Sequence, residues 1–404
     1  MPTLADAIRD LPRPVWLEID VDALSNNVGV VREIVGPNVQ ISAVVKADGY
    51  GHGMLQSAFA FESAGANRLC VASLDEALAL RDAGIKSPLL VLYPVPADRM
   101  AAAAAQNVEL TVTEPVTGPS ELVVQVEVET GLSRGGVKAD RLTELLAQLA
   151  SSHVRVGGIW THLASPEDEA VTAAQIAEFE GALSSLRDAG LEIPARHMAA
   201  TGGLFTARAP HYEGVRIGLG MYGLLPADLP IPDELKPFAE RLLPAMALKC
   251  KALRIEQFPP GTRVGYGGRW TAPRESWIAT LPVGYADAIP RTAPWGEALV
   301  KGRRVPLVGT IAMDAVMADI TDVMVQGVTS EDEFVLLGSQ GSEEIRADEL
   351  ARARNTIPWE VATSMSHRVP RVYHADSVLM GLRTLNSESR VSSTGVINIG
   401  DPHR

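Results

Sequence analysis

The feature that most constrains the fold is a regular alternation between short β-branched runs and longer Ala-rich segments. It extends from about Trp16 to about Leu225. Parallel strands joined by helical crossovers produce this rhythm. The sequence predicts eight such strands, at residues 41–46, 68–72, 88–93, 108–112, 122–129, 154–162, 195–200 and 214–218. Eight parallel strands close economically on themselves, so we predict an α/β fold built on a (β/α)8 TIM-type barrel.

Most of the crossovers are long enough to hold a helix. We expect helices near residues 22–35, 54–64, 73–83, 97–106, 139–150, 170–189 and 202–208. The connection between the fourth and fifth strands is different, because TEPVTGPSE is short and contains two prolines. Such a segment cannot hold a full helix, so one barrel helix is predicted to be missing there.

The rhythm changes after about residue 240, where strand follows strand between Gly and Pro turns. We therefore divide the chain into a barrel at 12–240 and a mostly β domain at 241–385, which includes a helical segment near 346–368. The remaining residues, 386–404, are rich in Ser, Thr, Asn and Gly, and they are predicted to form a flexible tail.

Composition limits the possible partners and compartments. A chain of 404 residues suits two domains, and its net charge of -13 argues against nucleic acid and anionic membranes as partners. Cys70 and Cys250 lie too far apart to form a metal-ligand or redox motif. The N-terminal residues lack the apolar core of a secretory signal, and no run of 18 apolar residues occurs. These features predict a cytoplasmic protein without a metal site.

Lys46 is the first candidate for chemistry. It ends a β-branched run and is followed by glycines in AVVKADGYGHG. In a barrel, the carboxyl ends of the strands face one mouth, where catalytic groups collect. An apolar setting lowers the pKa of an ammonium group and frees the amine to form a Schiff base. These residues alone are equally consistent with an ordinary solvated lysine beside a glycine turn.

Other polar residues follow the carboxyl ends of the predicted strands. Thr201 precedes two glycines at a predicted helix start, where a hydroxyl and backbone amides suit a phosphate group. Glycines after the last strand allow close backbone approach. The set therefore predicts a site for an anionic, aromatic cofactor, formed by Lys46, Tyr50, Arg134, His162, Thr201, Arg216 and Gly218.

Several longer motifs occur in one order along most of the chain. They are AVVKADGYGHG, ETGLSRGG, THLAS, HMAATGG, VRIGLGMYG, VGYGG, LPVGYAD, AMDA and TIPWEV. Over roughly residues 12–380 they resemble the motifs of the alanine racemase family. The resemblance implies an enzyme that uses pyridoxal 5'-phosphate to interconvert L- and D-alanine, in a head-to-tail homodimer with shared active sites.

The resemblance also implies roles for individual residues. Lys46 resembles the lysine that holds the cofactor covalently and acts as one of two bases. Tyr266 resembles the second base, which comes from the other subunit to the opposite face of the cofactor. A tyrosine is a poor base unless nearby cations favour its phenolate. Arg216 and His162 resemble that arrangement, with Arg216 at the pyridine nitrogen and His162 near the ring.

A second set of residues resembles the family's substrate contacts. Arg134 resembles the arginine that bonds the phenolic oxygen of the cofactor and helps to orient the substrate carboxylate. The backbone of Met313 resembles a second carboxylate contact from the other subunit, with Asp314 orienting it. Tyr285 resembles an entryway tyrosine, although a packed aromatic of the β domain is a serious alternative.

Four positions depart from the family pattern. Glu127 stands where the family carries a lysine that becomes carbamylated, so we hypothesise that its carboxylate pairs with Arg134; a solvated strand face is the alternative. Trp359 replaces a tyrosine that reaches the phosphate. Ala200 and Ala312 stand where asparagine and cysteine are common, which leaves the substrate side chain open.

Three alternative functions remain at this stage. The first is a racemase of another small amino acid, such as serine. The second is an amino-acid decarboxylase of similar architecture, but those enzymes typically place a cysteine acid in the second domain, where this chain has Tyr266 and only Cys250. The third is a non-catalytic carrier of pyridoxal phosphate on a lone barrel, against which the β domain argues.

Overall fold

The chain forms two compact units. The computed structural model describes residues 3–152, 154–292, 294, 296–392 and 395–400. One unit, here called the barrel unit, comprises residues 23–50 and 57–243. The other, here called the β unit, comprises residues 1–22, 51–56 and 244–404. The predicted boundary at residue 240 lies close to the observed one, but the segment 12–22, which we assigned to the barrel, groups with the β unit.

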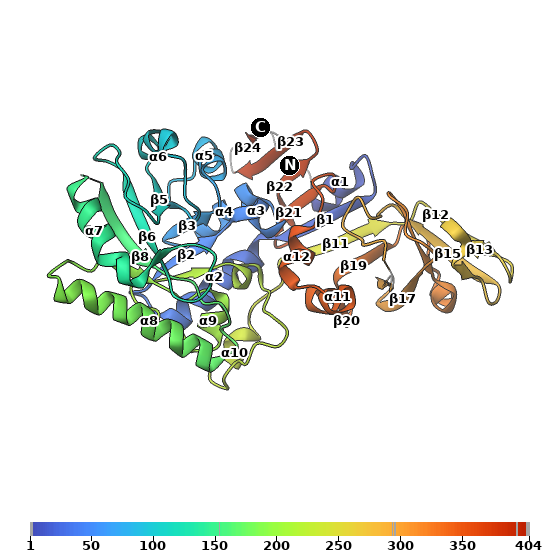
Figure 1. Cartoon of the computed structure of the whole chain (residues 1–404). Helices are drawn as coiled ribbons and strands as arrows, with labels where there is room; N and C mark the ends of the chain where they lie inside the picture. The colour runs from blue at the N-terminus through green and yellow to red at the C-terminus, as the bar shows by residue number, and fades with distance from the viewer. Residues whose placement is uncertain (1–2, 153, 293, 295, 393–394, 401–404) are drawn as a thin grey trace. The chain divides into compact units, whose positions relative to one another are not determined.

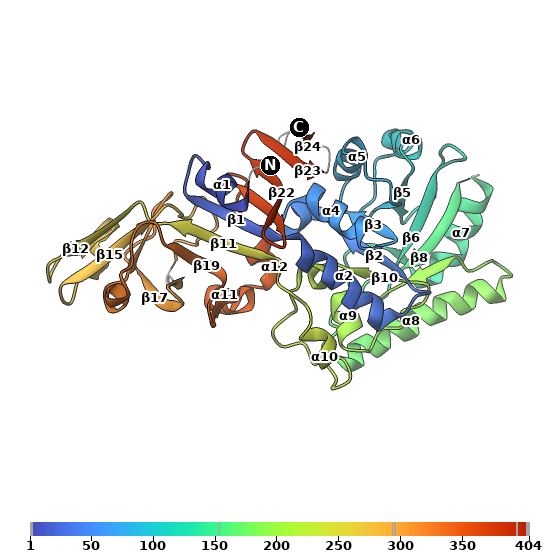
Figure 2. The same ribbon diagram turned by 180° about the vertical axis from the view of Figure 1, so that it is seen from behind.

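The barrel unit contains a closed ring of eight parallel strands, as predicted. Each strand pairs with its neighbour in parallel register, and pairing of the fourth with the fifth strand closes the ring. The strands can be followed in Figures 1 and 2. They are β2 (Gln40–Val44), β3 (Arg68–Val71), β4 (Leu89–Val91), β5 (Val108–Val112), β6 (Val123–Glu129), β8 (Arg155–Trp160), β9 (Ala195–His197) and β10 (Gly214–Ile217). The short β7 (Val137–Lys138) pairs with the end of β6.

Helices follow most of the barrel strands near the predicted positions. They are α2 (Val21–Val35), α4 (Met54–Ser63), α5 (Leu74–Asp82), α6 (Met100–Ala105), α7 (Leu142–Ser151), α8 (Glu169–Asp188) and α9 (Thr201–Phe205), with two further short segments, α3 (Lys46–Tyr50) and α10 (Lys236–Ala239). Residues 113–122, all of them described, contain no helix between β5 and β6. The prediction of a missing barrel helix is therefore confirmed.

The sequence of α7 explains how such a helix packs. Leu142, Leu145, Leu146 and Leu149 recur at helical spacing and are all buried. They form one apolar stripe, while the opposite face carries Glu, Gln and Thr. Burial of each leucine contributes roughly 1.5–3 kcal/mol relative to its exposure, so this stripe fixes which face of α7 is turned inward.

The β unit is dominated by one large sheet. Along its path the order is β12-β15-β18-β17-β16-β19-β11-β1-β21-β22-β23-β24, and β20 pairs with β19. The strands are β1 (Val15–Asp20), β11 (Met246–Lys251), β12 (Arg254–Phe258), β15 (Ser276–Leu281), β16 (Glu297–Val300), β17 (Arg303–Val308), β18 (Val316–Asp319), β19 (Glu333–Gln340), β20 (Glu343–Ile345), β21 (Arg371–Ala375), β22 (Val378–Thr384), β23 (Ser387–Ser392) and β24 (Gly395–Gly400). A two-stranded ribbon of β13 (Arg263–Val264) and β14 (Trp270–Thr271) is separate. The helices are α1 (Leu4–Arg9), α11 (Ala347–Arg354) and α12 (Pro358–Thr363).

Three strands of this sheet differ from the sequence-based expectation. β1 lies between β11 and β21, antiparallel to the first and parallel to the second, which is why the N-terminal segment belongs to the β unit. In the predicted flexible tail, β23 and β24 form an antiparallel pair that continues the sheet from β22. The polar composition of this segment suggested disorder, but an edge strand gains its hydrogen bonds from the neighbouring strand whatever its side chains.

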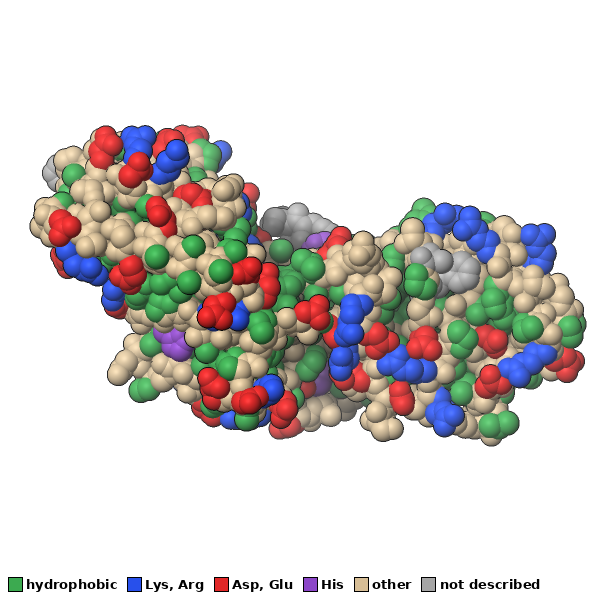
Figure 3. Space-filling model, turned by 60° about the horizontal axis from the view of Figure 1, so that its bottom comes forward, with side chains coloured by type: hydrophobic (Ala, Val, Ile, Leu, Met, Phe, Trp, Pro, Cys, Tyr) green, Lys and Arg blue, Asp and Glu red, His purple; other side chains and the backbone are tan. Residues whose placement is uncertain are grey.

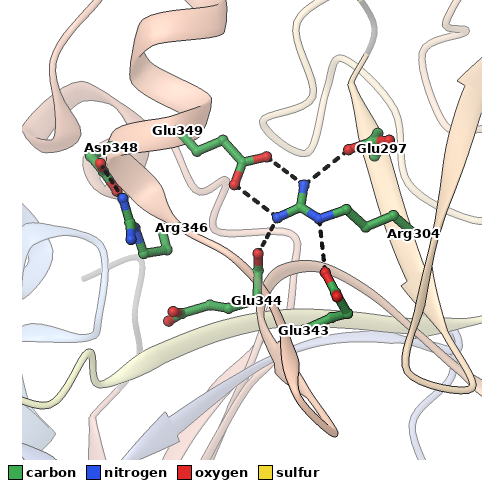
Figure 4. Close-up of polar contacts among 7 residues, drawn as sticks. All are labelled: Glu297, Arg304, Glu343, Glu344, Arg346, Asp348 and Glu349. Carbon is green, nitrogen blue, oxygen red and sulfur yellow. Dashed lines mark hydrogen bonds and ion pairs between the residues drawn. The ribbon is translucent and has the colours of Figure 1, made fainter.

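A partly exposed ion network connects several elements of the β unit. Arg304 of β17 contacts Glu297 of β16 at 2.9 Å, Glu343 of β20 at 3.2 Å and Glu349 of α11 at 2.6 Å (Figure 4). It also donates to the carbonyl oxygen of Glu344. The hydrogen bond that Arg304 donates to Glu349, followed by the one that it donates to Glu297, raises the pKa of Arg304 above its usual range. One guanidinium thus joins two strands, a hairpin and a helix.

The surface carries charges of both signs. On the face drawn in Figure 3, acidic and basic side chains are interspersed over both units. Among the described residues, no helix is long and apolar enough to cross a membrane.

The Arg304 network yields a stability prediction. Arg304→Met should lower the free energy of unfolding by about 1–2 kcal/mol, because several charge-assisted hydrogen bonds of a partly buried group are lost together. Denaturant unfolding measures this. Arg303→Met, at the exposed neighbouring position, is the matched control and should change stability by less than about 0.5 kcal/mol. Equal effects of the two substitutions would contradict a structural role for the network.

Candidate active site

Lys46 lies at the start of a left-handed turn that directly follows β2. The next residues all adopt positive φ, with values of 53° for Ala47, 56° for Asp48, 59° for Gly49 and 53° for Tyr50. Left-handed backbone costs roughly 1–2 kcal/mol per residue that carries a Cβ, so the surrounding structure must hold this turn in place. Strained backbone of this kind is concentrated at functional sites.

Glu76 is one of the groups that hold the turn. Its Oε1 accepts from the backbone nitrogen of Ala47 at 2.7 Å, and its Oε2 accepts from that of Ala72 at 2.7 Å. Glu76 also completes a capping box with Ser73 at the start of α5. The sequence analysis missed Glu76; the Ser-x-x-Glu spacing was visible, but its contact with Ala47 depends on the tertiary structure.

The environment of Lys46 differs from that of a solvated lysine. Burial, followed by repulsion from the Arg134 cation, lowers the pKa of Lys46 below that of an ordinary lysine. Tyr93, after β4, lies close to both cations: its ring centroid is 5.8 Å from Lys46 Nζ and 5.6 Å from Arg134 Cζ. A larger share of the amine is therefore neutral, and nucleophilic, at a given pH.

Arg216 is buried in the barrel with its guanidinium in a network of acceptors. Desolvation lowers its pKa to about 10, so it remains a cation at neutral pH. The ring of Trp160 lies 4.5 Å from its Cζ. The guanidinium nitrogens contact His197 Nδ1 at 2.7 Å, the His197 carbonyl oxygen at 3.0 Å, the Thr161 carbonyl oxygen at 2.8 Å and His162 Nδ1 at 3.2 Å.

These contacts fix the state of both histidines. A guanidinium can only donate, so Nδ1 of His162 and of His197 must each accept. Burial, followed by the charge of Arg216, lowers the pKa of His162 to about 3 and that of His197 well below its usual range. His162 is therefore neutral at physiological pH. The expectation that Arg216 and His162 together favour the Tyr266 phenolate stays a prediction, in which Arg216 supplies the positive charge.

A chain of polar side chains continues from His197 through the barrel core. His197 Nε2 donates to Gln125 Oε1 at 2.7 Å, and the Gln125 amide donates to Glu109. Arg68 in turn donates to Glu109 at 3.1 Å. Each bond has only one possible direction, so the chain holds His197 in the tautomer that Arg216 requires. The sequence analysis did not select His197, Gln125 or Glu109, although His197 lies in the HMAATGG motif.

Glu127 and Arg134 are paired, as hypothesised. Arg134 Nη2 lies 3.4 Å from Glu127 Oε1, and the glutamate side chain is only 8% exposed. Burial raises the pKa of Glu127, against the opposing effect of Arg134. The alternative of a solvated strand face is wrong, because Gln125 and Glu127 both lie among the buried residues.

The remaining barrel residues of the predicted site form a close-fitting cradle. Tyr50 is buried and its ring stacks on Tyr222 at 5.0 Å. A Cβ added at Gly218 would lie 2.4 Å from the Tyr50 hydroxyl, so only glycine fits there. Thr201 Oγ1 accepts from the backbone nitrogen of Gly220 at 3.1 Å, which joins the ends of β9 and β10. At the start of α9, Ala200 provides no side-chain cap.

Taken together, these residues are chemically suited to an anionic cofactor. The barrel unit supplies a lysine with a lowered pKa, two further cations in Arg134 and Arg216, and neutral His162. Hydroxyl donors come from Tyr50 and Thr201.

The other predicted site residues belong to the β unit. Tyr266, Tyr285 and Met313 are all exposed, by 69%, 42% and 51%. Backbone contacts connect their loops: Thr310 Oγ1 donates to the Tyr266 carbonyl oxygen at 2.8 Å, and Tyr285 N donates to the Ala312 carbonyl oxygen at 3.0 Å. Tyr285 is thus not the packed aromatic that we considered as an alternative.

Two further predicted residues of the β unit have partners within that unit. Asp314 forms an ion pair with Arg368. Trp359 lies in the first turn of α12, where its carbonyl oxygen accepts from Thr363 Oγ1 at 2.7 Å.

A closed parallel barrel with a desolvated lysine after its first strand, accompanied by a second unit of mostly β structure, defines a class of two-domain barrel enzymes. Family models identify the particular family. The N-terminal domain of alanine racemase matches residues 19–226, and the C-terminal domain of alanine racemase matches residues 245–373. The chain belongs to the alanine racemase family.

Individual relatives agree with this assignment. Alanine racemase from Desulfosudis oleivorans is 37% identical over 89% of this chain and 96% of its own length. Alanine racemase from Methanococcus maripaludis is 34% identical over 89% of this chain and 98% of its own.

Solved structures agree as well. The crystal structure of alanine racemase from Bacillus anthracis with bound L-Ala-P has a TM-score of 0.83 and 33% identity, covering 92% of this chain and 98% of that one. Alanine racemase from Streptomyces coelicolor has a TM-score of 0.78 and 33% identity, covering 89% and 98%.

The environment of Lys46 leads to a testable pH dependence. Burial and the Arg134 cation both disfavour the charged amine, so Lys46 of the cofactor-free protein should lose its proton at a lower pH than an ordinary lysine. Brief amine labelling across a pH series, read by mass spectrometry, gives the midpoint, with labelling of exposed Lys138 as the internal reference. In Arg134→Met the midpoint should move to higher pH, because the repulsion is removed. An unchanged midpoint would show that Arg134 does not act on Lys46.

Proposed function

We propose that this protein is an alanine racemase that uses pyridoxal 5'-phosphate and acts as a homodimer. The observation that carries the proposal is the match of both family domains across the chain, together with the desolvated Lys46 beside Arg134 and Arg216. The substrate is L- or D-alanine, and the product is its mirror image.

The barrel residues are assigned to the cofactor as follows. Lys46 would hold it covalently, Arg216 would donate to its ring nitrogen, and Arg134 would donate to its phenolic oxygen. Tyr50, Thr201 and the backbone at Gly218 would receive its phosphate end, and Trp359 replaces in sequence the tyrosine that resembles a further phosphate contact in the family. The bound cofactor supplies an electron sink for the charge that develops when the Cα proton leaves.

Two side chains move protons. Lys46 Nζ takes the Cα proton of one enantiomer, and the Tyr266 hydroxyl of the partner subunit returns a proton from the opposite side. In the reverse direction the roles are exchanged. The lowered pKa of Lys46 suits this role, because it increases the neutral fraction of the amine at a given pH, and only the neutral amine can accept a proton.

Arg216 limits side reactions. With a pKa of about 10 it keeps its proton at neutral pH, so it donates a hydrogen bond to the ring nitrogen without transferring the proton. Arg216 would thereby leave the ring nitrogen of a bound cofactor unprotonated and limit the electron sink that the cofactor would supply. The neutral state of His162 is consistent with a charged Arg216, because the guanidinium would repel a protonated His162.

The proposed dimer follows from the exposed side chains of the β unit. Tyr266, Tyr285 and Met313 are exposed on loops that hydrogen bonds connect, and exposed apolar surface can mark an interaction site. In the proposed assembly they complete the site of a second copy, and Met313 N–H and Arg134 bind the substrate carboxylate.

The direct test of the proposed function is racemisation in deuterated water. Each L-amino acid is incubated separately with the purified protein and cofactor, and Cα deuteration and chirality are followed. Alanine should give both enantiomers with deuterium at Cα. If serine is turned over faster than alanine, serine is the preferred substrate. Release of carbon dioxide would indicate a decarboxylase. Absence of any Cα exchange would reject the proposal.

Substitution of the two bases gives a second prediction. Lys46→Ala should abolish the visible absorbance of the bound cofactor and reduce kcat by at least about 10³-fold, because both the covalent link and one base are lost. Tyr266→Phe should retain the absorbance but lose proton exchange on one side. Full racemisation by Tyr266→Phe in both directions would remove Tyr266 from this role.

Glu127 gives a third prediction. Glu127→Gln should lower kcat/KM for alanine roughly 10- to 100-fold, because the charge-assisted bond that orients Arg134 contributes about 1.5–3 kcal/mol. Glu129→Gln, two residues along the same strand, is the control and should have little effect. Activity of the wild type should not depend on added bicarbonate, since the carboxylate is part of the side chain.

A further inference from the structure

We propose that Arg368 is a positioning residue that fixes the loop bearing Met313 and neutralises Asp314 beside it, so that this loop accepts the substrate carboxylate. The inference rests on the proposed function, because it assumes that Met313 contacts the substrate. It adds a residue that neither the sequence motifs nor the predicted site contained. All its members lie in the β unit.

The anchor of the arrangement is Asp287, whose side chain is fully buried. Arg13 pairs with both of its carboxylate oxygens, one at 2.8 Å. Asp287 Oδ2 also accepts from the backbone nitrogen of Gly284 at 2.9 Å. A buried carboxylate is stable only when it is paired and hydrogen-bonded in this way, so Asp287 and the 284–287 turn form a rigid base.

The loop bearing Met313 is hydrogen-bonded to this turn. Tyr285 N donates to the Ala312 carbonyl oxygen at 3.0 Å, and Ala286 N donates to the Met313 carbonyl oxygen at 3.0 Å. The approach is so close that a Cβ on Gly284 would lie 2.3 Å from the Ala312 oxygen and 2.5 Å from the Met313 oxygen. The two loops therefore behave as one unit, in which the Met313 carbonyl is already engaged and its direction is fixed.

Arg368 connects this rigid base to the outer end of the Met313 loop. Its Nε lies 3.2 Å from Asp287 Oδ1, and its Nη2 pairs with Asp314 Oδ1. The planar guanidinium can hold both carboxylates at once, whereas a lysine ammonium is a single point charge on a flexible stem. Arg368 is 36% exposed, so it can be replaced while Arg13 continues to pair with buried Asp287.

The electrostatic consequence concerns an incoming carboxylate. Asp314 immediately follows Met313, so its negative charge would repel a substrate carboxylate brought to the Met313 N–H. The Arg368 cation offsets that charge and holds the carboxylate of Asp314 in one direction. Removal of Arg368 should therefore weaken binding of ligands that carry a carboxylate, and should affect a neutral analogue much less.

The experiment compares Arg368→Met, Asp314→Asn and the double variant in the holoenzyme. KM and kcat are measured for alanine, and the apparent dissociation constants of alanine and alaninamide are measured from the cofactor absorbance. Arg274→Met, which breaks an exposed Arg–Asp pair elsewhere in the β unit, is the matched control. Thermal unfolding is recorded for each protein.

Arg368→Met should raise KM for alanine at least tenfold with kcat changed less than threefold, and the dissociation constant of alaninamide should change less than threefold. The double variant should have a lower KM than Arg368→Met, because the uncompensated charge of Asp314 is gone. Arg368→Lys should give an intermediate KM, and it replaces Arg368→Met in the experiment if that variant does not fold.

Three results would overturn the inference: an unchanged KM for alanine, an equal loss of affinity for alaninamide, or a double variant whose KM is no lower than that of Arg368→Met. A wild type that does not racemise alanine would instead reject the proposed function.

Discussion

The buried charge of Arg216 is the constraint on which the interior of the barrel depends. A guanidinium removed from water must find acceptors for its donors, and it finds two carbonyl oxygens and two imidazole nitrogens. That requirement keeps His162 and His197 neutral. It also explains why a barrel interior that could have been filled by aliphatic side chains contains Gln125 and Glu109, which continue the hydrogen-bond chain from His197.

The same charge shapes the chemistry at the barrel mouth. Arg216 and Arg134 both disfavour a protonated Lys46, while burial acts in the same direction. The lysine is held there by a left-handed turn whose strain is offset by contacts such as that of Ala47 with Glu76. In the β unit, buried Asp287 has a comparable organising role, because Arg13 and Arg368 meet on it and the loops of Tyr285 and Met313 are built around it.

The periodic pattern of apolar residues made the barrel fold predictable from the sequence. It did not predict the contacts between segments that lie far apart along the chain. All eight barrel strands and the missing helix were predicted because alternation of strands and helices is a local property of the sequence. The placement of β1 was not predicted, since strand pairing across hundreds of residues leaves no local signal. β23 and β24 pair with their neighbours in sequence, and they were missed because the polar composition of this segment suggested a flexible tail. The pairing of Glu127 with Arg134 was predicted from the resemblance to the family, in which a carbamylated lysine occupies the position of Glu127. Arg368, 54 residues from Asp314, lies in none of the family motifs and was missed.

The sequence by itself determined the family, the barrel and the identity of the residues at the strand ends. Motifs and hydrophobic periods are local patterns of consecutive residues, so they can be recognised without the structure. Only the tertiary structure decided their states. The tertiary structure surrounds each group with particular charges and apolar side chains. These neighbours decide whether Lys46 is desolvated, His162 is neutral and Glu127 is buried. The free energy of ionising a side chain depends on the groups within a few ångströms of it. Those groups come together only when the chain folds.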